Sequence, residues 1–248
     1  MILRQKYADN ISEAVAVCSL LSSRGYVTAE GGNLAVRLEE NLLLITPTRL
    51  NKGLVRDCDM VFIDIKGRII ESARKPTGEM PMYLNIFNQR PDIGSIIHAH
   101  PPAACAFAVI DDDNPLMRPF YPEMVIDCGP VPVVPYAEPL TEQLADNFTP
   151  FLDKYNTFIN FYINILIIKV MENHGVLVLN RGGIMEAYGK LDLLEGTARS
   201  LLYAKGAGFE LKEISRQEVE NLERTMQTRG IPFTGKPGAV KGLKELYY

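Results

Sequence analysis

The stretch Ile96-Ile97-His98-Ala99-His100-Pro101-Pro102 joins a short apolar run to two histidines and a proline pair. Proline lacks a backbone N–H and cannot continue a central strand, so the run predicts a buried strand that ends near His100. Side chains two residues apart in a strand point the same way, so His98 and His100 are expected to lie side by side. Such a pair is half of a metal site, although one buried and one exposed structural histidine would also fit.

The chain contains 3 histidines in all, and the third, His174, opens a second strand-like run at Val176-Leu177-Val178-Leu179. Three imidazoles, or three imidazoles and a carboxylate, form a donor set that a catalytic zinc ion uses, because the site must keep a position for water or substrate. The histidine content therefore favours a metal site.

Bulk composition is that of an ordinary globular protein. The chain has 248 residues, of which 47% are hydrophobic and 23% charged, with a formal net charge of -4. This length suffices to bury a sizeable core. No basic run predicts nucleic-acid binding. The 4 cysteines form no Cys-x-x-Cys pair and the N-terminus lacks the apolar core of a signal peptide, so we expect a cytoplasmic protein.

Apolar periodicity predicts alternating helices and extended segments. Helices are expected at 5–24, from about 77 to 89, at 101–110, 141–154 and 183–208, and from 216 onward. Extended segments are expected at 34–38, 42–45, 60–65, 68–71, 96–100, 125–127, 131–135 and 176–179. Residues 230–248 are rich in Gly, Pro and Lys and are expected to form an arm.

Two segments outside the histidine strand could carry chemistry. The glycine-rich loop Glu30-Gly31-Gly32-Asn33 could hold a phosphate, because glycines let backbone amides approach an anion closely; a plain turn is the alternative. In Lys75-Pro76-Thr77-Gly78-Glu79-Met80-Pro81, Thr77 is expected to cap a helix. Glu79 could simply complement the helix dipole, or it could be the acid/base of the metal site, and spacing does not distinguish the two.

Six segments occur in a distinctive order: Gly32-Asn33, Ile45-Thr46-Pro47-Thr48, Lys75-Pro76-Thr77-Gly78-Glu79, His98-Ala99-His100-Pro101-Pro102, Val134-Pro135-Tyr136-Ala137 and Asn173-His174-Gly175. Together they resemble the zinc-dependent class II aldolase/adducin family, and most closely its L-fuculose-phosphate aldolase branch, over roughly residues 5–210. The resemblance implies a single domain over residues 1–248, with a three-layer α/β/α fold and a mostly antiparallel central sheet. It also implies a homotetramer with active sites between subunits.

The resemblance further implies roles for individual residues. It makes His98, His100 and His174 ligands of one Zn²⁺ per chain, and Glu79 both a fourth ligand and the catalytic acid/base. The family's phosphate pocket corresponds to Gly32, Asn33, Thr48, Thr77 and Gly78.

The reaction that the resemblance implies is reversible cleavage of a ketose 1-phosphate, such as L-fuculose 1-phosphate, into dihydroxyacetone phosphate and an aldehyde such as lactaldehyde. Glu79 favours an aldolase, because epimerases of this fold typically carry Asp there. Sugar-phosphate epimerisation, dehydration or decarboxylation on the same metal site is the alternative. A metal-free adducin-like interaction module is a further one, against which the histidines and Glu79 argue.

The chain departs from the family pattern at several positions. Arg49 stands where relatives commonly have Gly, and it could either strengthen a phosphate grip or fill the pocket. Thr77-Gly78 replaces two serines. Tyr121 is assigned as general acid for the leaving group, with a packing role as the alternative. Tyr247 and Tyr248 resemble the family's mobile C-terminal tyrosine, although a frayed tail is expected.

The largest departure is an apolar insertion at about residues 159–170. It is too short to span a bilayer, which needs about 20 residues, so no membrane association is expected. Its β-branched, nearly uncharged composition is typical of an aggregation-prone strand. It could add a strand that pairs between subunits, or it could displace His174 and disable the metal site.

Overall fold

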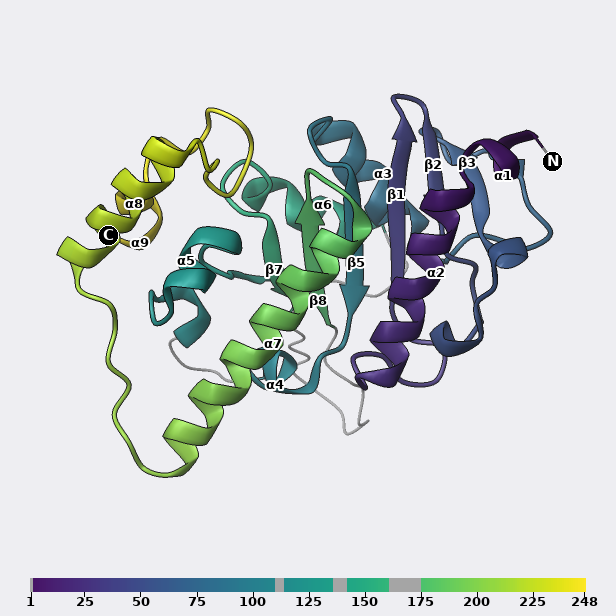
Figure 1. Cartoon of the computed structure of the whole chain (residues 1–248). Helices are drawn as coiled ribbons and strands as arrows, with labels where there is room; N and C mark the ends of the chain where they lie inside the picture. Colours follow the sequence, from purple (N-terminus) through teal and green to yellow (C-terminus); the bar gives the residue numbers. More distant parts are fainter. Residues whose placement is uncertain (1, 110–113, 136–141, 161–174) are drawn as a thin grey trace.

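The computed structural model describes residues 2–109, 114–135, 142–160 and 175–248. Within them the chain forms one 8-stranded sheet in the order β4-β3-β2-β1-β5-β8-β7-β6 (Figure 1). The strands are β1 Asn33–Glu39, β2 Leu42–Ile45, β3 Val61–Asp64, β4 Ile69–Glu71, β5 Ser95–Ala99, β6 Val133–Val134, β7 Thr157–Asn160 and β8 Val176–Asn180. Neighbouring strands run antiparallel, except that β6 and β7 are parallel.

The histidine strand lies at the centre of this sheet. β5 pairs with β1 on one side, where Asn33 is opposite His98, and with β8 on the other, where Leu177 is opposite His98. All its residues are buried. His100 follows one residue after the strand ends, so the predicted placement at a strand end is confirmed.

Helices cover both faces of the sheet (Figure 1). On one face, α2 and α7 pack against strand residues such as Val36 and Ile97 in the larger apolar core. On the other face, Tyr83 and Phe87 of α3 pack against Ala35 and Ile96. The helices are α1 Ile2–Lys6, α2 Ala8–Ser23, α3 Met80–Gln89, α4 Pro102–Ala106, α5 Pro122–Asp127, α6 Glu142–Phe148, α7 Ile184–Gly206, α8 Arg216–Arg229 and α9 Leu243–Tyr247. Short 3₁₀ turns occupy η1 Lys52–Leu54, η2 Asp57–Asp59, η3 Pro115–Met117 and η4 Thr149–Phe151.

The long amphipathic helices agree with the sequence prediction. In α7 the predicted stripe is buried throughout: Ile184, Ala187, Tyr188, Leu191, Leu194 and Ala198. Gly25 follows α2 with φ +69°, a left-handed conformation that favours glycine after a helix end. Ser215 and Glu218 form the predicted capping box of α8. None of the described helices has the length and apolar character that crossing a membrane would require.

Residues 125–127 were predicted to be extended, and this is wrong. They belong to α5, which begins at Pro122 after an extended Tyr121. Proline is well tolerated in a first helical turn because its missing N–H would have had no intrahelical partner. Burial of Met124 and Val125 then stabilises a short helix that β-branched residues alone would not favour.

The C-terminal segment packs against α5 and α8, so the prediction of an arm at residues 230–248 is also wrong. α9 packs with α8 and α5 in a third apolar cluster (Figure 1). Its buried members are Val125, Val219, Met226, Val240, Leu243 and Leu246. The predicted helix at 141–154 is shorter than expected: α6 ends at Phe148, and Thr141 lies outside the described residues.

Candidate metal centre

His98 and His100 face each other at the end of β5. Their Nε2 atoms are 3.1 Å apart and their ring centroids 4.9 Å apart, at an interplanar angle of 72°. His98 is buried, and its Nδ1 lies 3.1 Å from the Val176 carbonyl oxygen of β8. When Nδ1 carries the proton and donates it to that carbonyl, Nε2 is left with a lone pair on the side of His100. Metal-ligating histidines commonly donate their other ring N–H to a carbonyl in this way.

Glu79 is brought to the same place from a different element. It is the N-cap residue of α3, is buried, and has Oε2 3.7 Å from His98 Nε2. The Asn33 side-chain amide donates to this Oε2 at 2.7 Å. The Glu79 carboxylate and the His100 imidazole therefore both approach His98 Nε2, at the junction of α3, β1 and β5.

The predicted helix cap at Thr77 is displaced. The helix begins at Met80, with Pro81 in its first turn, so Glu79 rather than Thr77 is the N-cap residue. The Thr77 hydroxyl accepts only a long hydrogen bond, 3.4 Å, from the Glu79 backbone N–H. Because Glu79 makes no side-chain capping bond, its carboxylate can turn toward Asn33 and His98.

The donor set suits a divalent metal ion such as zinc. Two imidazole nitrogens and a carboxylate oxygen are preferred zinc ligands, and hydrogen bonds from behind hold both His98 and Glu79. Within the described residues no group of three or more His, Cys, Asp or Glu side chains is close enough together to hold a metal on its own. The fourth predicted ligand, His174, lies outside those residues.

Gly175, the first described residue before β8, lies against the histidine pair. A Cβ at this position would collide with the Ala99 carbonyl and the His100 ring, and would come within 2.9 Å of His98 Cε1. Only glycine fits here. The backbone next to residue 174 therefore passes beside both imidazoles.

The predicted phosphate-binding residues are distributed around this end of the sheet. Gly32 has φ +66°, and a Cβ there would lie 2.9 Å from the His98 carbonyl oxygen, so glycine is required. The segments that carry Thr48 and Thr77 pair with each other, since Thr48 N–H donates to Lys75 O and Thr77 N–H to Thr46 O. Gly78 is exposed beside them. The Asn33 amide is engaged by Glu79 instead of being directed at an open pocket.

Comparison with known proteins identifies the family. The model of the class II aldolase and adducin N-terminal domain matches residues 12–202. The chain belongs to this family. L-fuculose phosphate aldolase of Methanococcus maripaludis is 32% identical over 77% of this chain and 94% of that protein. 3-Oxo-tetronate 4-phosphate decarboxylase of Haemophilus influenzae is 28% identical over 81% of this chain and 89% of that protein.

The fold agrees with this assignment. A solved L-fuculose 1-phosphate aldolase superposes with a TM-score of 0.75 at 25% identity, covering 88% of this chain and 96% of that one. The predictions of a class II aldolase-like α/β fold and of a metal-dependent lyase are thereby confirmed. The matched proteins carry out more than one reaction, so membership of the class II aldolase family leaves the substrate open.

Arg49 has a backbone conformation that favours glycine. Its φ is +52°, in the left-handed region, where a side chain costs about 1 kcal/mol relative to glycine. The residue is exposed.

The sequence prediction missed two buried residues of the site. Tyr83, one turn after Glu79, is fully buried, and its hydroxyl donates to Asn33 Oδ1 at 2.6 Å. Its pKa is raised well above the ordinary value by burial and by the charge of Glu79. The spacing of four residues from Glu79 on one helix is the signal that could have found it.

Lys52 is the second missed residue. Its ammonium is buried and donates to the carbonyl oxygens of Glu30 (2.9 Å) and Leu50 (2.8 Å), which ties down the glycine-rich loop. Burial lowers its pKa. Lysine is rarely buried, so no sequence pattern pointed to this role.

Tyr121 lies in a different place from the histidines. It is 40% exposed and shares a crevice with Tyr247, Thr197 and Leu201 that is lined by none of His98, His100 and Glu79. Tyr247 belongs to α9, and burial raises its pKa, so the predicted frayed tail is wrong for this residue. Tyr248 is exposed, with the Arg216 guanidinium 5.3 Å from its ring centre.

Proposed function

We propose that the chain is a zinc-dependent class II aldolase that reversibly cleaves a ketose 1-phosphate of the L-fuculose 1-phosphate type. The products are dihydroxyacetone phosphate and an aldehyde such as lactaldehyde. The observation that carries the proposal is the approach of both His100 and Glu79 to His98 Nε2 at one strand end, with Asn33 holding the carboxylate. An adducin-like interaction module would not need this donor set.

One Zn²⁺ per chain would be held by His98, His100, His174 and Glu79. Gly175 supports the place of His174, because its backbone lies against both described imidazoles. When bound, zinc supplies Lewis acidity toward the substrate carbonyl oxygen and stabilises negative charge that develops beside it. His98 and Glu79 are buried, and burial strengthens such an electrostatic interaction.

Glu79 is the acid/base of the proposed reaction. Carbon–carbon cleavage leaves a carbanion next to a carbonyl, and a proton must be delivered to that carbon. The Glu79 carboxyl is buried beside the histidines, and its Oε2 is oriented by Asn33, whose own amide oxygen is held by Tyr83. This chain of hydrogen bonds fixes the direction from which the proton is transferred.

Gly32, Asn33, Thr48, Thr77 and Gly78 are proposed to surround the substrate phosphate. The hydroxyls of Thr48 and Thr77 lie on adjoining segments, and Lys52 fixes the preceding loop through Glu30. In this arrangement the backbone of Gly32 and Asn33 would line the phosphate pocket, while the Asn33 side chain donates its hydrogen bond to Glu79.

Tyr121 is proposed as the general acid for the leaving group. Its crevice is separate from the histidines of its own chain, so it would serve the site of a neighbouring copy in a homotetramer.

All 4 cysteines are free thiols, which suits the proposed cytoplasmic location.

A decarboxylase is the second candidate. The similarity to 3-oxo-tetronate 4-phosphate decarboxylase favours it, because loss of carbon dioxide also leaves a carbanion beside a carbonyl and can use the same residues. The two reactions release different products. Cleavage of L-fuculose 1-phosphate gives dihydroxyacetone phosphate, whereas the decarboxylase substrate releases carbon dioxide.

The first experiment is elemental analysis of the purified protein, with His98→Ala and His174→Ala alongside. We expect about one zinc per chain in the parent and little in either variant. Assays of dihydroxyacetone phosphate release from L-fuculose 1-phosphate, and of carbon dioxide release from 3-oxo-tetronate 4-phosphate, then separate the two candidates. A parent that binds no zinc after reconstitution would refute both.

A further inference from the structure

The chain segment after His100 depends on an outside residue for its structure. α4 begins directly after Pro101 and has only 5 residues. Pro101 offers no side-chain acceptor as N-cap residue, and Pro102 has no N–H. Cys105 N–H closes the first helical bond to Pro101 O, which leaves the N–H groups of Ala103 and Ala104 without partners inside the helix.

Glu195 of α7 accepts both of these N–H groups. Its Oε1 lies 3.1 Å from Ala103 N and its Oε2 2.9 Å from Ala104 N. The residue is 1% exposed, and Arg199, one turn later, lies 3.2 Å from Oε1. A buried carboxylate that spans two backbone donors is a strong, directional anchor, because charge-assisted hydrogen bonds exceed neutral ones.

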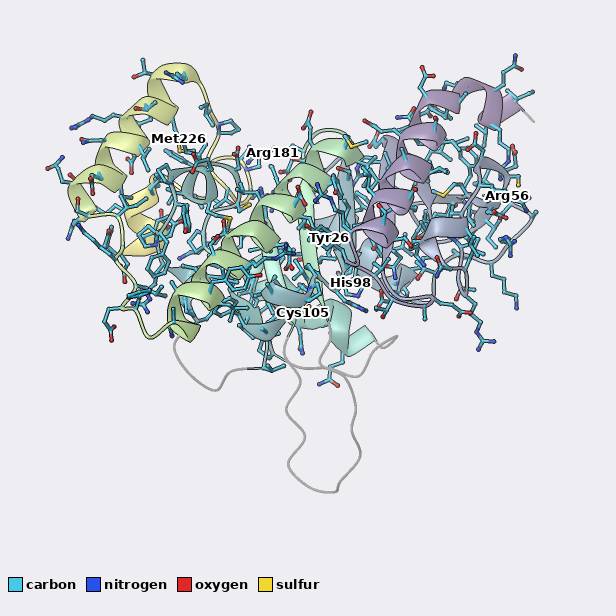
Figure 2. All side chains as sticks on the ribbon, turned by 60° about the horizontal axis from the view of Figure 1, so that its bottom comes forward. Tyr26, Arg56, His98, Cys105, Arg181 and Met226 are labelled. Atoms are coloured by element: carbon cyan, nitrogen blue, oxygen red, sulfur yellow. The ribbon has the colours of Figure 1, made fainter. Side chains whose placement is uncertain are left out.

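The backbone before α4 is tied to the same helix. His100 N–H donates to the Tyr26 carbonyl at 2.6 Å, and the buried Tyr26 donates its hydroxyl to Asp192 at 2.5 Å. Asp192 precedes Glu195 by three residues, so both carboxylates lie on one face of α7. Figure 2 shows Tyr26, His98 and Cys105 of α4 gathered at this end of the sheet.

We propose that Glu195 and Asp192 are positioning residues that fix the His100 imidazole for metal binding. The inference rests on the proposed metal function. Glu195 holds the helix that follows His100, and Asp192, through Tyr26, holds the His100 backbone itself. Outer hydrogen bonds of this kind commonly contribute about 10-fold to 100-fold to metal affinity.

The test is zinc affinity of the metal-free protein, measured by competition with a chromophoric chelator. Glu195→Gln keeps one acceptor and loses the other, so we expect zinc affinity to fall by about tenfold or more. Glu186→Gln is the matched control, because Glu186 lies exposed in the first turn of α7 and contacts Asn180 at the other end of β8. Its affinity should equal that of the parent.

A merely structural role would lower thermal stability without changing zinc affinity of the folded protein. Measurements are therefore made well below the unfolding temperature, and thermal unfolding of the metal-free Glu195→Gln and Glu186→Gln proteins is recorded in parallel. A fall in zinc affinity in the folded Glu195→Gln protein, with no fall in Glu186→Gln, supports the positioning role. Tyr26→Phe, which removes only the hydroxyl, carries the same test if Glu195→Gln does not fold. Parent affinity in the folded variants overturns this inference alone, whereas a parent that binds no zinc overturns the proposed function as well.

Discussion

The Asn33 side-chain amide spans Tyr83 and Glu79: its oxygen accepts from the Tyr83 hydroxyl at 2.6 Å, and its nitrogen donates to Glu79 Oε2 at 2.7 Å. An amide side chain supplies the donor and the acceptor that this position requires. The two groups that flank it are one turn apart on α3, at its N-cap and in its interior. The direction of the Glu79 carboxylate is thus set from inside the core.

Tyr83→Phe should release the Asn33 oxygen and loosen Glu79. We expect a loss of about 1–2 kcal/mol in the free energy of unfolding, because a buried acceptor loses its donor. Turnover should also fall, while zinc content stays the same. Urea unfolding and steady-state kinetics measure the two effects, and Tyr203→Phe, at an exposed position, is the control. Unchanged turnover would show that the Tyr83 hydroxyl is not needed to position Glu79.

Glu79→Gln should lower turnover far more than it weakens phosphate binding. A neutral amide cannot carry the proton, and the loss of a general acid or base typically costs about 10²-fold to 10⁴-fold in rate. Inorganic phosphate should still inhibit the residual activity competitively, with little change in its inhibition constant. Equal losses in turnover and phosphate affinity would mean that Glu79 mainly shapes the pocket.

Asp92→Asn should lower the free energy of unfolding at neutral pH and reduce the loss of that free energy on acidification. Burial alone would raise the pKa of Asp92, but hydrogen bonds from the buried Arg90 guanidinium (2.7 Å each) and from Arg181 lower it. A lowered carboxyl pKa adds stability above the unfolded value, about pH 4, and this stability is lost as pH falls through the folded value.

The expected loss for Asp92→Asn at neutral pH is about 3 kcal/mol, since it removes the carboxylate that pairs with Arg90. Urea unfolding at neutral pH and at about pH 3 measures both the loss and its pH dependence. The difference between parent and variant should shrink at the lower pH. Asp153→Asn, at an exposed position, should leave both values unchanged.

Deleting residues 161–170 should improve solubility without loss of zinc. Ile159 and Asn160 belong to β7, and Ile159 pairs with Val176 and Val133, so the removable part of the apolar insertion begins after Asn160. The deletion would leave 171–175 as the link between two antiparallel strands, a common length for such loops. Soluble yield and zinc per chain are the measurements. Loss of zinc would show that the insertion supports the metal site.

The histidine strand, the hairpins and the long helices could be predicted because their signals are local. In α7, a helix of 23 residues, the buried stripe recurs from Ile184 to Leu201, and in β5 the proline pair marks the strand end. Periodicity needs length, and α9 has only 5 residues, so its burial against α8 depends on tertiary contacts that no local pattern carries.

The candidate site was predictable in part for the same reason. Metal-ligand residue types and the resemblance pointed to His98, His100 and Glu79. Lys52 and Tyr83 were not predicted, because their roles depend on their neighbours in the folded chain. The Lys52 ammonium donates to two backbone carbonyls, and the Tyr83 hydroxyl donates to the Asn33 amide oxygen. Glu195 contacts residues that are about 90 positions away in sequence, as the separation of 91 to Ala104 shows.

The apolar cluster shared by α5, α8 and α9 has a consequence for where this domain ends. The family match stops at residue 202, yet Val125, inside the match, is covered by Val219, Leu243 and their neighbours beyond it. Arg90 likewise donates to the Gly235 carbonyl at 2.9 Å. The family match therefore ends at residue 202, whereas the packed apolar cluster extends to Leu246. A protein cut at the homology boundary would expose an apolar surface and leave a buried guanidinium with fewer acceptors.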